Sequence, residues 1–546
     1  MSPHRRSALT AAAIVTVALL LRVFRIGDQE LWFDEAFSFH MATIPTGLWE
    51  ALRIENSPPL HYLFLRAWAW VAGTSEVALR LPSAAFGALG VALTIAAGRR
   101  LFNWRVGLWA GAVMAVSPIH IYYSQEARSY TTVICLLLLT YLLLLRALDH
   151  SSPGRWTATG LAGLAAIYTH YWAILGLLPS VLLLRVWPSP YPMRDRLLGY
   201  AAAASLIAAC VVPWVIWSFV LISHPFSVGP SMVRVWEQIP PALAIPKSLE
   251  LFGIGHQADT YPNVVKVYPS LQFPTSLRLV GIGLFVLLAV WTIVPWGDRR
   301  LEIPDIGRRK TLLWSWLAIA VGGMWIVSMF RPTSMVGRHD LVALPAFMLL
   351  VGFALAKLQA LPGKASLLAS VAALGIFVVV GLKLFLYYQI AASHPPEPSY
   401  RQTAAVLVSQ AQTGDMVTFN SIHGTPLLYY LHRLGYRWEQ RECRNPGTGR
   451  HFGCRIFLPD EEVEYGLPDD PSSLSSFARM LRFSLKGPDN VLWVVADGAF
   501  ISDRVFLAEL AALDLVGDRV PISNGVPLFA FRPHDALRST IGIAGS

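Results

Sequence analysis

Long apolar runs recur along the first two-thirds of this chain, and they constrain its fold more than any other feature. A run of about 18 or more apolar residues is long enough for a helix to cross the roughly 30 Å hydrocarbon core of a bilayer. The composition agrees, because 54% of the residues are hydrophobic and 14% are charged. Soluble domains carry about 25% charged residues. The chain is therefore predicted to be a polytopic α-helical membrane protein.

About eleven membrane-spanning helices are predicted from these runs. They cover residues 7–24, 78–97, 106–119, 130–145, 156–168, 172–187, 198–218, 277–296, 312–330, 341–356 and 366–388. The first run follows Arg5 and Arg6 as in a signal peptide. No small-residue cleavage site comes after it and further spans do, so an uncleaved anchor is expected.

The net charge of +10 is explained by membrane topology rather than by nucleic-acid binding. If the N-terminus is cytoplasmic, the inner loops receive most of the basic residues and the outer loops receive few, which is the positive-inside bias. We therefore predict a multi-pass protein of the bacterial cytoplasmic membrane, with its C-terminal region outside. The inner basic residues are Arg5, Arg6, Arg99, Arg100, Arg105, Arg146, Arg155, Arg185, Arg194, Arg196, Arg299, Arg300, Arg308, Arg309, Lys310, Lys357 and Lys364.

Hydropathy falls from about Tyr400, and strand-like runs begin to alternate with helical ones. Strands are expected at 416–420, 491–497 and 527–533, and helices at 401–412, 425–435 and 504–516, the second of these ended by Gly435. This alternation predicts a small α/β layer. The predicted domains are a membrane domain over 1–390, with a large outer loop at 25–77, and an extracytoplasmic α/β domain over 391–546. No glycine-rich phosphate loop follows a strand, so nucleotide binding is not expected.

The four cysteines divide into two pairs. Cys135 and Cys210 lie inside predicted spans and read as small apolar core residues. Cys443 and Cys454 lie close together in the C-terminal region, where an outside location favours a disulfide over free thiols. A zinc site would need more ligands than His451 alone.

An acidic pair, Asp34 and Glu35, follows the first span and is surrounded by aromatic residues. A partly desolvated carboxylate is more basic, which suits a general base. A loop of this length also holds an acidic pair by chance, and this alternative stays open.

Two further outer segments carry cations at the ends of spans. The first contains Glu126, Arg128 and Tyr130, and the second contains Arg331, Arg338 and His339. The guanidinium group of arginine can donate two hydrogen bonds to phosphate oxygens. The candidate phosphate ligands are therefore Arg128, Arg331 and Arg338. Anchoring to lipid headgroups is the alternative.

Two histidines, His61 and His170, also fall on the outer side. Either could join acidic side chains as a metal ligand, although lone histidines more often make structural hydrogen bonds. No cofactor is certain, and a divalent metal held by Asp34, Glu126 and His61 is the one candidate.

Several segments occur together in an order known from one family. These are LWFDEAFSF, the PPL of ENSPPLHYLFLRAW, GRRLFNWRVGLWAGAVMAVSPIHIYYSQEARSYT, YTHYW and RHDLVALPA. The chain resembles membrane-embedded glycosyltransferases of the GT-C fold, specifically bacterial members similar to protein O-mannosyltransferases and the aminoarabinose transferase (glycosyltransferase family 39-like). The resemblance covers roughly the first 360 residues.

The resemblance implies a polyprenyl-phosphate sugar as donor and a glycan, lipid or protein as acceptor, within membrane lipids. It implies an inverting single displacement with Asp34 as base and Glu35 orienting it. Arg128 with Arg331 or Arg338 would offset charge on the donor phosphate. Glu126, Tyr130, His61, His170 and His339 would support the site. Asn56 and Ser57 depart from the Glu-Lys of aminoarabinose-transferase-like chains, which puts that contact in doubt.

Two other functions remain open from the sequence. A transporter or flippase of a lipid-linked sugar would place charges at mid-membrane on broken helices and often shows repeat symmetry. A non-catalytic envelope-assembly protein would use the C-terminal domain as a binding module. The charges here gather at outer span ends, which favours the enzyme.

Overall fold

The structure is a computed structural model, and it forms two compact units. The helical unit comprises Met1–Ile26 and Pro45–Ile390, and the α/β unit comprises Gly27–Ile44 and Ala391–Ser546. The expected division placed residues 27–44 with the membrane helices, whereas the structure groups them with the C-terminal unit. The structure describes residues 2–43, 52, 57–218, 241–255, 274–330, 336–393, 399–439, 442–444, 451–457, 490–495, 507–508, 510–511, 515–522 and 526–533.

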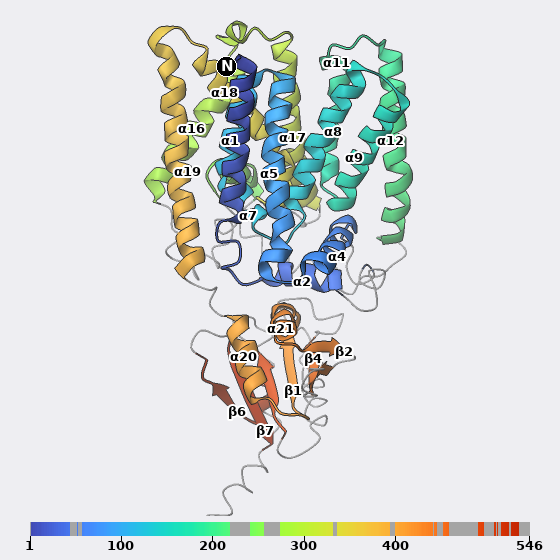
Figure 1. Ribbon diagram of the computed structural model, residues 1–546, viewed down its shortest axis with the longest axis vertical. Helices are drawn as coiled ribbons and strands as arrows, with labels where there is room; N and C mark the ends of the chain where they lie inside the picture. The colour runs from blue at the N-terminus through green and yellow to red at the C-terminus, as the bar shows by residue number, and fades with distance from the viewer. Residues whose placement is uncertain are drawn as a thin grey trace, which may run out of the picture. The chain divides into compact units, whose positions relative to one another are not determined.

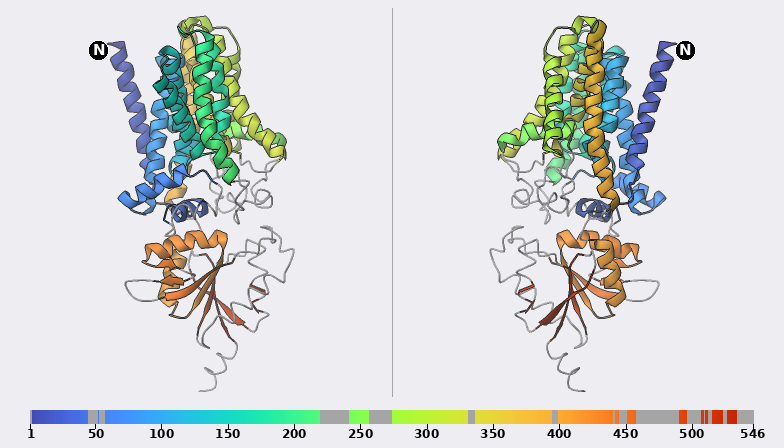
Figure 2. Two further views of the ribbon diagram at one scale, coloured as in Figure 1. Left: turned by 90° about the vertical axis from the view of Figure 1, so that its right-hand side faces the viewer. Right: turned by 90° about the vertical axis from the view of Figure 1, so that its left-hand side faces the viewer.

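The long helices of the helical unit run side by side (Figures 1 and 2). The elements of this unit are α1 (Pro3–Val23), α4 (Leu60–Ala72), α5 (Glu76–Leu101), α6 (Trp104–Val116), α7 (Pro118–Ser124), α8 (Tyr130–Asp149), α9 (Pro153–Thr169), α10 (Ala173–Leu177), η1 (Leu178–Leu182), α11 (Leu183–Val186), α12 (Met193–Ile216), α14 (Pro241–Gly253), α16 (Thr275–Ile293), η5 (Asp298–Leu301), α17 (Ile306–Phe330), η6 (His339–Ala343), α18 (Leu344–Gln359), η7 (Gly363–Ser366) and α19 (Leu367–Ser393).

Each predicted span coincides with helical structure in this unit. Within the described ranges, eight helices are long and apolar enough to cross a membrane, and the bent pair α6–α7 makes a ninth if it counts as one span. The helix α9 and the α10–α11 segment are shorter. The structure is thus that of a polytopic α-helical membrane protein, and the number of about eleven crossings stays a prediction.

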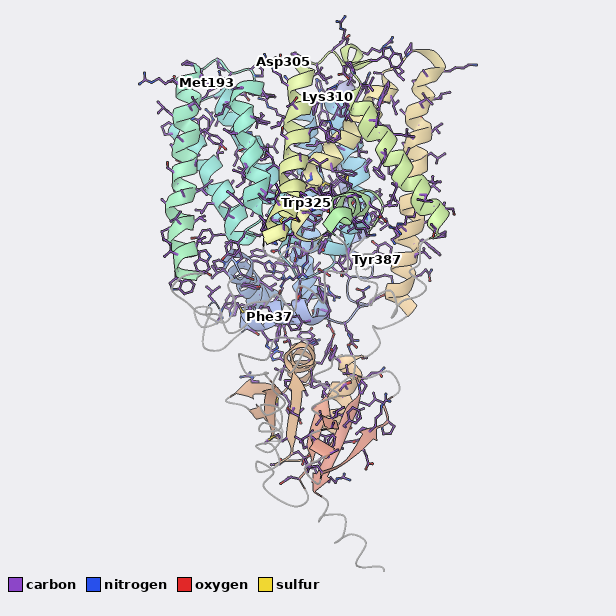
Figure 3. All side chains as sticks on the ribbon, turned by 180° about the vertical axis from the view of Figure 1, so that it is seen from behind. Phe37, Met193, Asp305, Lys310, Trp325 and Tyr387 are labelled. Atoms are coloured by element: carbon purple, nitrogen blue, oxygen red, sulfur yellow. The ribbon has the colours of Figure 1, made fainter. Side chains whose placement is uncertain are left out.

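The two ends of the helical unit differ in charge. The N-terminus, the start of α12 at Met193 and the turn before α17 at Asp305 lie at one end, whereas Tyr387 on α19 lies near the other (Figures 1 and 3). The helix ends at this first end contain basic residues that the sequence predicted to be cytoplasmic, such as Arg5 near the start of α1 and Arg194 near the start of α12. We call it the basic end. Because α1, α5 and α6 run alternately along the bundle, α8 begins away from the basic end (Figure 1).

Helix α18 is the centre of the bundle, and nearly all of its residues are buried. Small residues let its neighbours come close, as membrane helices commonly require. A Cβ added at Gly352 would lie 2.5 Å from the Ala110 nitrogen on α6, and one added at Gly107 would lie 2.5 Å from the Ile95 carbonyl oxygen on α5. The contacts between α5, α6 and α18 therefore depend on glycine at these positions.

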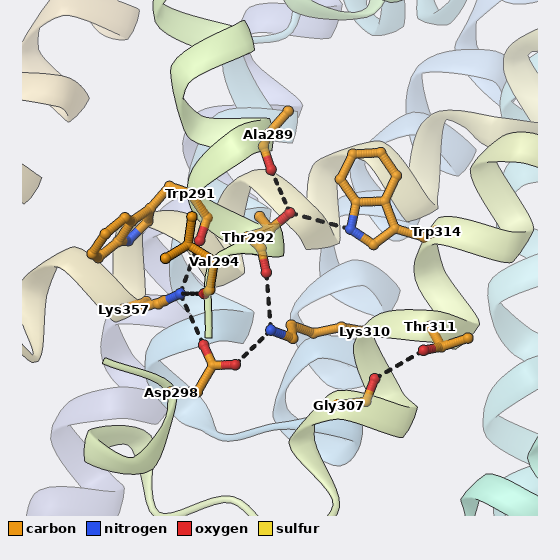
Figure 4. A network of polar contacts seen from close by, with 10 residues as sticks. All are labelled: Ala289, Trp291, Thr292, Val294, Asp298, Gly307, Lys310, Thr311, Trp314 and Lys357. Atoms are coloured by element: carbon orange, nitrogen blue, oxygen red, sulfur yellow. Dashed lines mark hydrogen bonds and ion pairs between the residues drawn. The ribbon is translucent and has the colours of Figure 1, made fainter. Parts of the chain in front are cut away.

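Two buried lysines donate hydrogen bonds to backbone carbonyl oxygens at the C-terminus of α16 (Figure 4). Lys310 Nζ donates to the Thr292 carbonyl at 3.0 Å, and Lys357 Nζ donates to the Trp291 carbonyl at 2.8 Å. Asp298 lies between them, 2.5 Å from Lys310 Nζ and 2.9 Å from Lys357 Nζ. Cations at a helix C-terminus interact favourably with its dipole, so this cluster fixes the end of α16.

A proline break separates α6 from α7, and the two helices are bent by 63°. Pro118 begins α7 and cannot donate a backbone hydrogen bond. The buried Arg22 of α1 satisfies the carbonyls that end α6, donating to Ala115 O at 3.0 Å and Met114 O at 3.2 Å. It also donates to the Ser124 hydroxyl at 3.1 Å. This contact holds the segment that leads into the candidate site.

The α/β unit contains one mixed sheet with the described strand order β2-β3-β4-β1-β5-β7-β6. Strands β4, β1 and β5 are parallel to each other, and the remaining pairs are antiparallel. Helices α20 and α21 lie beside the sheet (Figure 2). The elements are α2 (Phe33–Thr43), α20 (Tyr400–Gln410), β1 (Met416–Asn420), α21 (Ser421–Arg433), β2 (Arg437–Glu439), β3 (Glu442–Arg444), β4 (His451–Phe457), β5 (Leu492–Val495), β6 (Leu515–Val520) and β7 (Leu528–Pro533).

The predicted α/β layer is present, with two differences. The helix expected over 504–516 was wrong at its end, because β6 begins at Leu515 and pairs with β7. The strands β2, β3 and β4 were not predicted. The ending of α21 was predicted correctly, since Gly435 takes a φ of +88° just beyond it.

Cys443 on β3 is buried and disulfide-bonded. The neighbouring strand β4 includes Cys454, whose side chain lies outside the described ones, so the pairing of these two residues stays a prediction. Cys135 and Cys210 are free.

Candidate active site

The acidic pair lies in the first turn of α2, in the α/β unit. Asp34 is half-buried and Glu35 is buried. The ring of Phe33 stacks on that of Phe37 with 6.3 Å between centroids, and the Ser38 hydroxyl donates to the Asp34 carbonyl at 2.9 Å. Phe33 and Phe37 thus lie on the same helix as the two carboxylates. The role of Asp34 as base stays a prediction.

In the helical unit, Arg338 and Tyr130 form the centre of a buried polar cluster. Arg338 Nε donates a hydrogen bond to the Tyr130 hydroxyl, and the guanidinium carbon lies 5.6 Å from the centroid of that ring. The Tyr123 hydroxyl donates to the Gly337 carbonyl at 3.0 Å, which holds the segment before Arg338. Gly337 has a φ of +74°, a conformation that favours glycine. Burial lowers the pKa of Arg338 to about 10, so the guanidinium is charged at neutral pH.

Arg128 lies in the turn between α7 and α8. Burial lowers its pKa, but Tyr62, Tyr130 and Glu126 outweigh this effect and raise the pKa above its ordinary value. Its carbonyl accepts a hydrogen bond from the Ser83 hydroxyl on α5 at 3.1 Å. The predicted group of Glu126, Arg128 and Tyr130 is therefore one cluster, and it shares Tyr130 with Arg338.

Two predicted histidines border this cluster. The ring of His170 lies 5.5 Å from that of Tyr130 and 5.8 Å from that of His339. Burial, followed by the charge of Arg128, lowers the pKa of both His61 and His170 to about 3. Both rings are therefore neutral at physiological pH. Among the described residues, His61 Nε2 and His170 Nδ1 are buried atoms with no hydrogen-bond partner.

A buried polar group without a partner is costly, and such groups beside two arginines point to a ligand. Neutral imidazole nitrogens supply a donor or an acceptor, while the arginines supply positive charge. Together they can bind an anion that also carries hydroxyl groups. A phosphate with a sugar attached has this chemistry.

The segment after Arg338 is tied to α14. The Ser248 hydroxyl donates to Asp340 Oδ2, and both residues are buried. His339 stacks on Trp172, with 6.1 Å between centroids. The sequence did not predict Ser248, Tyr62, Tyr123 or Ser83 as part of the site, because nothing in their local pattern separates them from other helix residues.

Arg331, the third predicted phosphate ligand, lies outside the described residues. In the part of the chain that the structure describes, no group of three or more His, Cys, Asp or Glu side chains could hold a metal ion. Metal binding by Asp34, Glu126 and His61 stays a prediction, since Asp34 belongs to the α/β unit and the other two residues belong to the helical unit.

The comparisons with known proteins agree on the fold. The family model described as dolichyl-phosphate-mannose-protein mannosyltransferase matches residues 56–217. None of the curated protein sequences compared with the chain matches it.

Three solved structures are similar over nearly the whole chain. ArnT from Cupriavidus metallidurans in the apo state has a TM-score of 0.55 and 14% identity, covering 96% of this chain and 98% of that one. The same protein bound to undecaprenyl phosphate has a TM-score of 0.57 and 15% identity, covering 95% and 97%. The Archaeoglobus fulgidus oligosaccharyltransferase in the apo form has a TM-score of 0.55 and 11% identity, covering 94% and 73%. The chain is therefore a polytopic membrane protein with the GT-C fold, the fold of membrane-embedded glycosyltransferases.

Proposed function

We propose that this protein is a glycosyltransferase that moves a sugar from a polyprenyl-phosphate donor to an acceptor hydroxyl. The reaction takes place at the outer face of the bacterial cytoplasmic membrane, with the basic end of the helical unit in the cytoplasm. One solved relative is described as bound to undecaprenyl phosphate, which supports this class of donor. Glycan, lipid and protein acceptors all fit the proposal.

The observation that carries the proposal is the cluster around Tyr130. It brings Arg128 and Arg338 together from segments far apart in sequence, beside the unpartnered nitrogens of His61 and His170. Two positive charges in one buried cluster attract an anion. A donor phosphate would supply the anion, and the sugar hydroxyls would supply partners for the histidines.

The mechanism is a single displacement at the anomeric carbon. The Asp34 carboxylate removes the proton from the acceptor hydroxyl, and the acceptor oxygen attacks the anomeric carbon with inversion. The bond between that carbon and the phosphate oxygen breaks, and polyprenyl phosphate leaves with one additional negative charge. Arg128 and Arg338 offset this charge as it develops, and Glu35 orients Asp34.

We propose that a part of the donor's lipid tail lies in an apolar groove between α14, α16, α17 and α18. The groove has a volume of about 450 Å³, and its lining includes Phe285, Trp314 and Phe347. Lys247 and Arg278 also line it and both bind Glu250, at 3.3 Å and 2.5 Å respectively, which leaves one net positive charge.

Helix α14 joins this groove to the candidate phosphate site. Lys247 lies on α14 next to Ser248, whose hydroxyl donates to Asp340. Asp340 follows Arg338 by two residues. A polyprenyl chain in the groove would therefore have its phosphate end near the cationic cluster.

Complementation of a deletion strain tests this function. Mass spectrometry of surface glycans and glycoproteins should show a sugar that disappears on deletion and returns with the wild-type protein. The Asp34→Asn variant should not restore it, because an amide cannot accept the acceptor proton. Asp195→Asn is the matched control, since this exposed acid lies on α12 in the helical unit, and it should restore the sugar fully.

Binding separates the enzyme from its alternatives. Purified Asp34→Asn should bind undecaprenyl phosphate as tightly as the wild type, measured by native mass spectrometry. A flippase or a scaffold would tolerate the substitution, so full restoration of the sugar by Asp34→Asn would overturn the proposal.

A further inference from the structure

The helix that carries Asp34 is packed as a part of the C-terminal α/β unit. Residues Gly27–Ile44 belong to this unit, and α2 packs against α21. The chain leaves the helical unit at Ile26, whose carbonyl accepts a hydrogen bond from Arg80 at 2.9 Å. Beyond that point, the segment makes hydrogen bonds to residues between 369 and 399 positions later.

Glu30 makes the most specific of these contacts. It is 5% exposed, and Oε1 accepts a hydrogen bond from the Ser399 hydroxyl at 2.5 Å. Its Oε2 accepts from the backbone N–H groups of Tyr400 at 2.9 Å and Arg401 at 3.2 Å. These are the first residues of α20, whose N-terminal N–H groups have no partner within the helix. A carboxylate there is favoured by the helix dipole as well.

Tyr430 on α21 makes a second contact with the same segment. Its hydroxyl accepts a hydrogen bond from the Leu31 backbone N–H at 2.9 Å. Leu31 follows Glu30 directly, so two adjacent residues of the segment bind two different helices of the α/β unit. The segment cannot rotate about either contact alone.

The far part of α2 is held as well. His40 Nε2 lies 3.2 Å from the Thr425 carbonyl, within hydrogen-bond distance. The buried ring of Phe39 packs edge-on against Tyr429, with 5.0 Å between centroids. Contacts on both sides of Asp34, at residues 30–31 and 39–40, therefore fix this helix on the α/β unit.

We infer that the α/β unit is the frame that positions Asp34, with Glu30 and Tyr430 as positioning residues. This inference rests on the proposed function. The α/β unit then has a part in catalysis, because the segment that carries the base is bound to α20 and α21. Loss of either contact should displace the carboxylate without removing it.

Three variants and one control test this role. Glu30→Ala removes all three hydrogen bonds, Glu30→Gln keeps the shape and part of the acceptor capacity, and Tyr430→Phe removes one hydroxyl. Asp518→Asn is the control, because it removes a carboxylate from an exposed position on β6 in the same unit. All are measured in the full-length protein, with the lipid-linked sugars extracted from wild-type membranes as the donor.

The expected result is a loss in kcat with little change in donor KM. A displacement of about 1 Å can cost on the order of 100-fold in rate, so Glu30→Ala and Tyr430→Phe should lose tenfold or more. Glu30→Gln should recover part of this loss, and Asp518→Asn should match the wild type. Hydrogen exchange of the amides in residues 33–43 should be faster in Glu30→Ala and Tyr430→Phe only.

Hydrogen exchange does not require turnover, so it separates this inference from the proposed function. Wild-type kcat in both Glu30→Ala and Tyr430→Phe would overturn the inference, as would unchanged exchange over residues 33–43. Exchange could rise as expected while Asp34→Asn keeps full turnover. In that case Glu30 and Tyr430 do hold α2 in place, but Asp34 is not the base. If Glu30→Ala does not fold, Tyr430→Phe carries the test alone.

Discussion

Arg338 Nε donates a hydrogen bond to the hydroxyl of Tyr130, a residue 208 positions earlier in the chain. This contact joins the segment that begins α8 to the segment that precedes η6. It places two buried side chains of complementary chemistry in one cluster with Arg128, and the proposed phosphate site depends on it.

Replacing Arg338 should therefore impair transfer strongly. Arg338→Ala should lower kcat by about 10²- to 10³-fold, since it removes charge stabilisation of the leaving phosphate. Arg338→Lys should recover part of this loss, because lysine keeps the positive charge but cannot donate a bidentate hydrogen bond to phosphate. Initial rates of sugar transfer give the measurement. Arg105→Ala, at an exposed position, is the control and should leave the rate unchanged.

The low pKa of His61 predicts that the protein becomes less stable as the pH falls. The folded protein keeps this ring neutral down to about pH 3, whereas the unfolded chain binds a proton below about pH 6.5. The contribution of His61 to stability is complete above about pH 6.5 and is lost as the pH falls towards 3. At about pH 4.5 the loss amounts to roughly 3 kcal/mol.

His61→Asn keeps a short polar side chain but does not titrate. Its Tm should fall less than that of the wild type between about pH 7 and about pH 4.5, as followed by thermal unfolding in detergent. His150→Asn is the control, because His150 is exposed, and it should behave as the wild type. An equal fall in Tm for His61→Asn and the wild type would contradict the assignment.

The glycine contacts at the centre of the bundle predict a packing defect. Gly107→Ala should destabilise the protein by about 1–3 kcal/mol, because the added methyl group would meet the Ile95 carbonyl oxygen. Gly154→Ala is the matched control, since a Cβ there meets nothing within 4 Å. Thermal unfolding of both variants should show a lower Tm for Gly107→Ala alone.

The lysine cluster at the end of α16 predicts that removing one charge, that of Asp298, lowers the stability of the protein. Asp298→Asn would leave Lys310 and Lys357 buried without their shared carboxylate, at a cost of about 3–5 kcal/mol. Asp305→Asn removes an acid from an exposed ion pair with Arg308 and should have little effect. Denaturation in detergent measures both, and equal stability of the two variants would refute the role of the cluster.

Much of the fold could be predicted from the sequence, because membrane helices must be long and apolar. The span expected over 130–145 is α8, and Tyr130 begins it as the pattern indicated. The break at Pro118 changed the span expected over 106–119 into two helices. The strand β6 was missed because an apolar periodic run can form either a helix or a strand, and pairing with β7 decides between them.

The candidate site could be predicted only in part, for a similar reason. The sequence placed Arg128 and Arg338 at span ends on one side of the membrane, and in the structure both interact with Tyr130. Their binding of phosphate stays a prediction. The contact of Glu30 with Ser399 could not be predicted, because it joins residues 369 positions apart and depends on the docking of α2. Local patterns contain no information about such partners.

Release of polyprenyl phosphate by the purified protein tests the central claim most directly. The account predicts that Asp34→Asn lowers this rate by about 10²- to 10⁴-fold, the usual contribution of a general base. Its affinity for undecaprenyl phosphate should be the same as that of the wild type. Release at the wild-type rate by a folded Asp34→Asn variant would contradict the account.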